Sequence, residues 1–161
     1  MSEFSHLDAH HNPSMVDVGT KTITRRTATA QSIVVLTGEI MQQLAGGDIQ
    51  TPKGAVFQTA MLAGTMAAKR TADLIPLCHP LGLDSCRFSF RTVGNEVVIE
   101  CTTSLEARTG VEMEALVGAS VAALTVYDMC KAFSHDLVIR ETKLLAKTGG
   151  KRPYHRPETH P

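Results

Sequence analysis

The stretch Lys69–Leu81 reads KRTADLIPLCHPL and brings together two cations, a carboxylate, a thiol and an imidazole. Pro76 and Pro80 disfavour helical backbone angles at the residues before them, so we expect His79 in an extended loop after a helix. A rigid loop that presents an imidazole suits ligand binding. The local sequence is equally compatible with a buried turn that carries a structural histidine.

Other reactive side chains lie at both ends of a helix predicted over residues 110–133: Glu112 and Glu114 at its start, Asp128 and Lys131 near its end. Each pair also has a plain structural reading, as first-turn carboxylates at a helix dipole and as a surface ion pair. Glu114 and Asp128 are fourteen residues apart, which is about 21 Å along a continuous helix. Either one of them is structural, or the site forms where two chains meet.

Composition limits the classes of function. The 161 residues predict one domain, and equal numbers of basic and acidic residues (16 each) give no general attraction to nucleic acid or to a membrane surface. The absence of Trp argues against base recognition by stacking. The four cysteines show no zinc-ligand spacing, so we expect reduced thiols, no metal site and a cytoplasmic protein. No apolar run is long enough to span a bilayer.

The first half of the chain predicts a strand over residues 22–36, rich in Thr, Ile and Val. We expect Thr37 to cap a short helix that turns Ile40, Met41 and Leu44 inward and ends at Gly46-Gly47. Residues 51–54 form a turn. A second helix over residues 55–71 is rich in small side chains. These imply close contact with another surface, which we interpret as a subunit interface.

The second half predicts a hairpin of strands near residues 86–91 and 97–99, then the long helix, then a strand over residues 137–145. The order β-α-α-β-β-α-β predicts an α+β fold, a ferredoxin-like antiparallel sheet packed against helices with one extra helix. We expect a mobile segment over residues 1–14, a single catalytic domain over 15–151 and a mobile tail over 152–161.

Three separated blocks carry a resemblance to a known family: Lys69–Leu81, Thr109–Leu116 (TGVEMEAL) and Tyr127–Ala132 (YDMCKA). Together with Met15–Val18 and Lys147–Lys151 they resemble the signature segments of the MoaC family, the cyclic pyranopterin monophosphate synthases of molybdenum cofactor biosynthesis. The similarity runs from about residue 15 to residue 151 and agrees with a ferredoxin-like fold.

The resemblance implies a lyase that converts a 3′,8-cyclised dihydro-GTP into cyclic pyranopterin monophosphate and releases pyrophosphate, without a cofactor. It also implies a homo-oligomer, a hexamer built as a trimer of dimers, with active sites between subunits.

The resemblance also implies roles for individual residues. Asp128 becomes the catalytic acid or base, and Lys131 and Lys53 become active-site lysines. Substrate contacts fall on Leu77, Cys78, His79, Met113 and Glu114, and Glu112 orients a lysine or the guanine-like edge. Candidate cations for the triphosphate are Lys69, Arg70, Arg26 and Lys147.

The sequence departs from the family pattern at Ala55, where the family commonly has Asp, and at Arg152-Pro153, where it often has Ser-Gly. Two other functions compete with the synthase. One is a nucleotide-binding sensor without turnover. The other is a metal-dependent hydrolase that uses Cys78, His79 and Cys130, although neighbouring side chains of an extended loop point in opposite directions.

Overall fold

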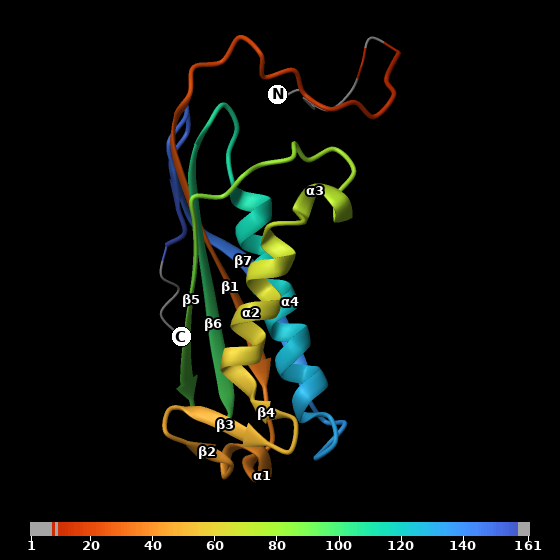
Figure 1. Cartoon of the computed structure of the whole chain (residues 1–161), viewed down its shortest axis with the longest axis vertical. Coiled ribbons are helices and arrows are strands. Elements are labelled where there is room, and N and C mark those ends of the chain that lie inside the picture. The colour runs from red at the N-terminus through yellow and green to blue at the C-terminus, as the bar shows by residue number, and fades with distance from the viewer. Residues whose placement is uncertain (1–7, 9, 158–161) are drawn as a thin grey trace.

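The computed structural model describes residue 8 and residues 10–157. Its centre is an antiparallel sheet in the order β5-β6-β1-β7-β8 (Figure 1). The strands are β1 (Thr24–Val35), β5 (Ser85–Val93), β6 (Glu96–Ala107), β7 (Val138–Thr148) and β8 (Tyr154–His155). The central strand β1 pairs with β6 along its whole length, which joins the start of the domain to the hairpin.

Two long helices, α2 (Val56–Ala68) and α4 (Glu112–Cys130), pack side by side on one face of the sheet (Figure 1). The order β1-α2-β5-β6-α4-β7 and its antiparallel sheet are those of a ferredoxin-like domain, which confirms the predicted α+β class. Two one-turn helices, α1 (Gly38–Met41) and α3 (Thr71–Leu74), are added to this framework.

The core lies between the sheet and the two helices. Its largest cluster includes Val34, Ile99, Val56, Ala122 and Val126, all fully buried. The sheet face away from the helices carries polar pairs instead, such as Thr29 with Thr102 and Gln31 with Glu100. Because only one face of the sheet is apolar, helices cover that face alone.

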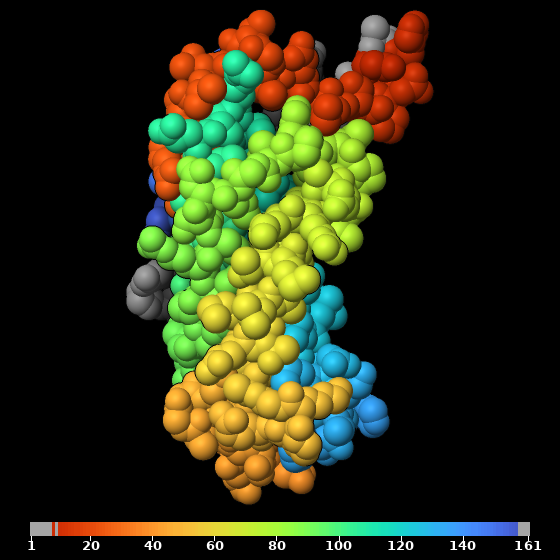
Figure 2. Space-filling model, viewed as in Figure 1, coloured from red at the N-terminus to blue at the C-terminus, as the bar shows by residue number. Residues whose placement is uncertain are grey.

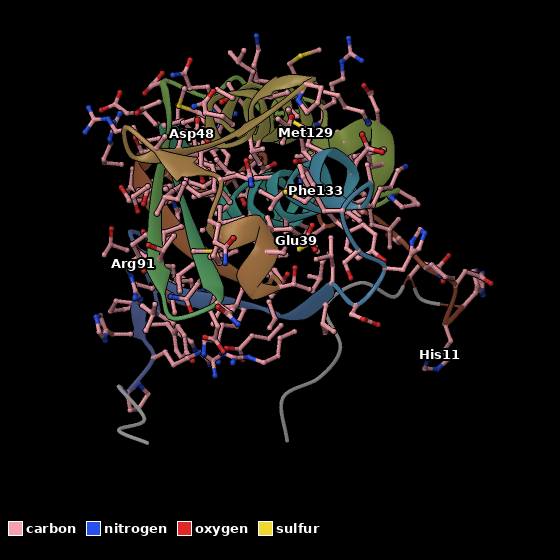
Figure 3. The ribbon with its side chains drawn as sticks, turned by 90° about the horizontal axis from the view of Figure 1, so that it is seen from below. His11, Glu39, Asp48, Arg91, Met129 and Phe133 are labelled. Carbon is pink, nitrogen blue, oxygen red and sulfur yellow. The ribbon has the colours of Figure 1, made fainter. Side chains whose placement is uncertain are left out.

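The segment after Thr37 corrects the sequence prediction. Its helix is the single turn α1, and Thr37 makes no side-chain cap. Leu44 lies in a small sheet of β2 (Leu44–Ala45), β3 (Asp48–Thr51) and β4 (Gly54–Ala55), where it is 38% exposed and not turned inward. Gly46 and Gly47 have positive φ, so they form the turn of a hairpin and do not end a helix. This sheet and α1 lie at one end of the domain (Figure 1), which Figure 3 shows from below.

The start of α2 is capped by a residue from this small sheet. Ala55 occupies the N-cap position and has no capping side chain. The buried carboxylate of Asp48 instead accepts hydrogen bonds from the backbone N–H groups of Phe57 and Gln58, at 2.7 and 3.1 Å. Asp48 therefore satisfies the free donors of the helix and fixes the adjacent β3–β4 turn, which carries Lys53.

The small residues of α2 pack against α4 of the same chain. Ala60, Gly64 and Ala68 are buried, and a Cβ added at Gly64 would lie 2.7 Å from the carbonyl oxygen of Gly118. The predicted close contact is thus confirmed, but this face of α2 is internal and our interpretation of it as a subunit interface was wrong. Small residues are what two helices need for so close an approach.

By length and composition, α4 is the one helix in the described residues that could cross a membrane; half of its apolar stretch is buried inside the domain, as in a core helix. The predicted mobile segments, 1–14 and 152–161, include residues 1–7, 9 and 158–161, which lie outside the described residues. Within the tail, Tyr154 and His155 pair with β7.

Candidate active site

The helix α4 is uninterrupted from Glu112 to Cys130, so the reactive side chains at its two ends form two separate clusters. The fourteen-residue spacing of Glu114 and Asp128 corresponds to about 21 Å along the axis. We call the cluster around Glu114 the pocket cluster and the cluster around Asp128 the lysine cluster.

The pocket cluster brings together two motifs that are more than thirty residues apart in the sequence. The loop after α3 and the first turn of α4 line one cavity of about 460 Å³. Six predicted substrate contacts line it: Leu77, Cys78, His79, Glu112, Met113 and Glu114. This loop is not extended throughout: Pro76 and Leu77 form a turn, in which the Cys78 N–H donates to the Ile75 carbonyl oxygen at 3.1 Å, and His79 follows this turn.

Glu114 is the most deeply buried acid of this cluster, at 3% exposure. Burial raises the pKa of its carboxyl group and the negative charge of Glu112 adds to the rise, while a hydrogen bond from its own backbone N–H opposes it. Burial and the charge of Glu114 also raise the pKa of the Cys78 thiol. A carboxyl group whose pKa is raised towards neutrality can donate or accept a proton during a reaction.

Glu112 forms a partly buried ion pair with Lys147 of β7, with Oε1 2.7 Å from Nζ. Its carboxylate folds back over Gly110, where a Cβ would collide with it. A residue with a Cβ at position 110 would therefore force the Glu112 carboxylate to move. Lys147 is thus the lysine that Glu112 contacts in this structure.

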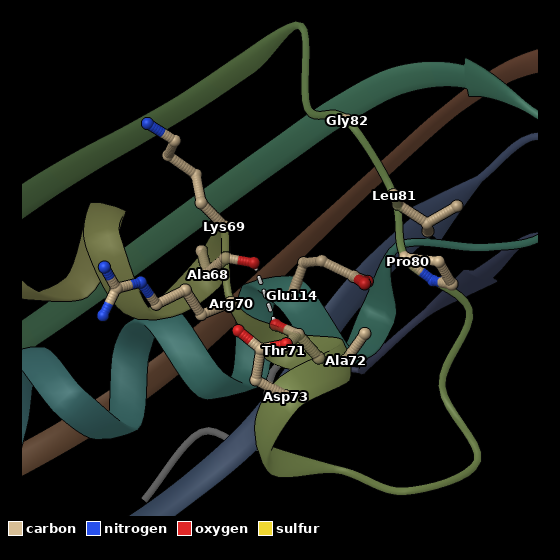
Figure 4. Close-up of a pocket in the computed structure, with 10 residues that line it drawn as sticks. All are labelled: Ala68, Lys69, Arg70, Thr71, Ala72, Asp73, Pro80, Leu81, Gly82 and Glu114. Carbon is tan, nitrogen blue, oxygen red and sulfur yellow. Dashed lines mark hydrogen bonds between the residues drawn. The ribbon is translucent and has the colours of Figure 1, made fainter.

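The remaining predicted cations do not line the main cavity. Lys69 and Arg70 line an adjacent pocket of about 230 Å³ that shares Glu114, and their charged ends point away from that carboxyl group (Figure 4). Arg26 donates to the backbone carbonyls of Ala107 and Arg108 at 3.3 and 3.4 Å, so it holds the end of β6.

The lysine cluster lies at the other end of α4. Asp128 Oδ1 is 2.6 Å from Lys131 Nζ, and Asp128 Oδ2 is 3.5 Å from Lys53 Nζ. About half of each side chain is exposed. The last turn of α4 places Asp128 and Lys131, and the β3–β4 turn places Lys53. The structure thus brings the three predicted catalytic residues together.

The electrostatics of this cluster favour charged groups. The hydrogen bond and charge of Lys131 hold the pKa of Asp128 below its usual range, and the charge of Lys53 lowers it further. The same hydrogen bond raises the pKa of Lys131. One carboxylate between two ammonium groups leaves a net positive charge, which suits a phosphate oxygen. In the isolated chain, Asp128 is a weak base because its pKa is low.

The residues of the metal-hydrolase alternative are not brought together. Cys130 is buried at the end of α4 that carries Asp128, whereas Cys78 and His79 line the cavity at its other end. Within residue 8 and residues 10–157, no three His, Cys, Asp or Glu side chains have the geometry to hold a metal ion.

Several residues of the cavity were not predicted to touch a ligand. Val16, Val18 and Lys21, from the segment before β1, line it together with Thr109 and Gly110. Two valines and a solvent-facing lysine do not, by residue type alone, indicate a binding site. Only the resemblance of Met15–Val18 and Thr109–Leu116 to segments of the family could have indicated that these segments line the cavity.

Fold and site together define an α+β enzyme domain with a carboxyl-lined cavity and a separate lysine cluster. The MoaC family model matches residues 15–150. A cyclic pyranopterin monophosphate synthase from Xanthomonas axonopodis pv. citri is 53% identical over 94% of this chain and 92% of its own. One from Desulforapulum autotrophicum is 48% identical, with 94% and 93% covered. The chain belongs to the MoaC family, as the sequence predicted.

A longer relative is also similar. The molybdenum cofactor biosynthesis bifunctional protein of Synechocystis is 50% identical over 92% of this chain, which covers 44% of that protein. The same domain is therefore found both alone and within a larger chain.

Proposed function

We propose that this chain is a cyclic pyranopterin monophosphate synthase, a lyase that acts in molybdenum cofactor biosynthesis. Its substrate is 3′,8-cyclo-7,8-dihydroguanosine 5′-triphosphate. The reaction opens the purine-derived ring, builds the pyranopterin, closes a cyclic phosphate and releases pyrophosphate. The observation that carries the proposal is that Leu77–His79 and Glu112–Glu114, the two substrate-contact motifs, face one cavity.

The two clusters divide the work of this reaction. Ring opening and reclosure need proton transfers, for which the buried Glu114 carboxyl group and the His79 imidazole are suited. Loss of pyrophosphate needs positive charge, which Lys53 and Lys131 supply beside Asp128. Asp128 acts as the acid or base once a polyanionic substrate draws the lysines away from its carboxylate. Lys147, Lys69, Arg70 and Arg26 add positive charge around the substrate.

One substrate molecule cannot bridge both clusters of one chain, so we propose that each complete site combines the pocket cluster of one chain with the lysine cluster of another. The assembly is a hexamer, a trimer of dimers, in the cytoplasm. Support for self-association comes from large apolar side chains that α2 and α4 leave between 39% and 63% exposed: Met61, Leu62, Met66 and Leu124.

Direct turnover tests the proposal. The purified full-length protein is incubated with the cyclised dihydro-GTP, freshly made, and two products are followed: pyrophosphate and cyclic pyranopterin monophosphate, measured as its fluorescent oxidised derivative. We expect turnover by the wild type and a loss of about 10²–10⁴-fold in kcat for Asp128→Ala and for Lys53→Ala, because each removes a group that moves a proton or stabilises charge.

Matched controls come from ion pairs elsewhere. Asp84, as exposed as Asp128, pairs with Arg25, and Lys143 pairs with Glu141. We expect Asp84→Ala and Lys143→Ala to retain turnover. Binding of substrate by the wild type without product would contradict the proposal and favour a nucleotide sensor. Unchanged kcat in Lys53→Ala would remove Lys53 from the mechanism.

A further inference from the structure

The cavity of the pocket cluster has a wall that neither substrate-contact motif provides. Val16, Val18 and Lys21 line it from the segment that precedes β1. Val18 also lines a neighbouring pocket with His79 and Arg108. In Figure 2 the described residues near the N-terminus, coloured red, cover one end of the molecule. We call residues 16–21 the N-terminal wall.

Hydrogen bonds hold the N-terminal wall in place at both ends. The carbonyl oxygen of Val16 lies 2.8 Å from Nε2 of His79, and the carbonyl oxygen of Lys21 accepts from Nε of Arg108 at 3.2 Å. Between them the chain forms a compact turn, in which the Lys21 N–H bonds to Val18 O and the Asp17 carboxylate accepts from the Gly19 N–H. The N-terminal wall is thus hydrogen-bonded to His79 in the loop after α3 and to Arg108, the residue before Thr109–Leu116.

The contact with Val16 determines which nitrogen of a neutral His79 ring carries the proton. A carbonyl oxygen can only accept a hydrogen bond, so the nitrogen that faces it, Nε2, must carry the proton. In a neutral imidazole the other nitrogen, Nδ1, then has a free lone pair. Since His79 is half-buried and lines the cavity, Nδ1 is the ring nitrogen left for a ligand.

We propose that the N-terminal wall is a working part of the site: Val16 fixes His79 as the Nε2–H tautomer, so that Nδ1 accepts a hydrogen bond or a proton from the substrate. Val16 is then a positioning residue that acts through His79. This inference rests on the proposed function for the identity of the substrate, but the contact between wall and ring is independent of it.

Two substitutions separate the two ring nitrogens. The amide nitrogen of His79→Gln reaches the position of Nε2 and can still donate to Val16 O, but it offers nothing at Nδ1. The amide of His79→Asn reaches only the position of Nδ1, so it loses the contact with Val16. We expect His79→Gln to lose about 10²-fold or more in kcat with little change in KM. We expect His79→Asn to raise KM because its cavity wall is loose.

The rate of proteolysis measures how often the N-terminal wall opens, and this measurement does not require turnover. Lys21 is the first Lys or Arg of the chain, and the next is Arg25, so trypsin cleavage after Lys21 gives an N-terminal fragment that mass spectrometry identifies. Cleavage follows the population in which the wall is open, and one hydrogen bond changes that population about fivefold. We therefore expect faster cleavage in His79→Asn and in Arg108→Ala, and a wild-type rate in His79→Gln and in the control Arg87→Ala.

GTP serves as a stable triphosphate probe for the same assay. It should slow cleavage after Lys21 in the wild type and in His79→Gln, and have less effect in His79→Asn. The inference is overturned if His79→Asn is cleaved at the wild-type rate, or if His79→Gln keeps the wild-type kcat. A wild type that makes no product refutes the proposed function, and proteolysis with GTP then decides the role of the wall alone.

Discussion

Glu114 and Asp128 are carboxyl groups of one helix in opposite electrostatic settings. Burial raises the pKa of Glu114, whereas Lys131 and Lys53 lower the pKa of Asp128. Two acids whose environments push their pKa values apart are suited to different roles, one protonated and one ionised at the same pH. We therefore expect Glu114 to supply a proton more readily than Asp128 in the free protein.

The raised pKa of Glu114 makes a prediction about stability. The folded state binds the proton of Glu114 more tightly than the unfolded state does, so this contribution is full below the ordinary pKa of Glu, about 4.3, and is lost as the pH rises through the raised pKa. Glu114→Gln removes the ionisation. Its Tm should exceed that of the wild type at pH 7, and the difference should shrink towards pH 4, as measured by circular dichroism.

The control for this experiment is Glu106→Gln, because Glu106 is exposed on β6. It should leave Tm close to that of the wild type across the same range. If the difference in Tm between Glu114→Gln and the wild type does not change with pH, it arises from packing of the side chain and not from its ionisation.

At the scale of elements, the crossing of α2 and α4 has no spare room. A Cβ at Gly64 would lie 2.5 Å from Cζ of Phe88 and 2.7 Å from the carbonyl oxygen of Gly118. The backbone of α4 cannot move freely, because Ala122 and Val126 of the same helix are fully buried in the close-packed core. Because the two clusters lie at opposite ends of α4, this crossing also holds them in their relative positions.

Gly64→Ala should therefore destabilise the domain although alanine is the better helix former. Overpacking of a core typically costs about 1–3 kcal/mol, and each kcal/mol lowers Tm by about 2–4 °C in a domain of this size. Gly38→Ala is the matched control, because nothing lies within 4 Å of a Cβ there. Thermal unfolding of both variants checks this; equal Tm values would mean that the crossing can relax.

Long elements could be predicted from the sequence because residues typical of one structure continue over many positions: β1 is rich in Thr and Val, and α4 is a mostly apolar run of 19 residues without proline. The small sheet could not, since β2 and β4 are two residues each and carry no periodicity. Asp48 caps a helix that begins eight residues later, whereas capping rules consider only the residue directly before a helix. The motifs identified six residues of the cavity as substrate contacts, but not Val16, Val18 or Lys21. The partners of Arg26 are backbone carbonyls of residues 107 and 108, and side-chain types do not indicate such contacts.

At the scale of the whole molecule, the separation of the two clusters makes the shared site testable. Glu114→Ala lacks an acid of the pocket cluster, and Asp128→Ala lacks the acid of the lysine cluster. If each site takes one cluster from each of two chains, mixed assemblies contain some sites with both acids intact. Mixing the two inactive variants should restore about a quarter of the wild-type turnover for random pairing at equal amounts.

Subunit exchange must be shown in the same sample, for example by mass spectrometry of differently tagged chains. Asp128→Ala mixed with Lys53→Ala is the matched control. Both changes lie in the lysine cluster, so no site regains a complete one and turnover should stay low. Absence of recovery in the first mixture, with exchange demonstrated, would mean that one chain supplies the whole site.

The unbroken α4 helix also links activity to the symmetry of the assembly. Under the shared-site proposal, two chains related by a twofold axis each complete the other, so every site in the pair works. Chains arranged head to tail leave one incomplete site at each open end unless the ring closes. A closed assembly therefore has the same turnover per chain whatever its size, whereas dilution that separates the chains abolishes turnover.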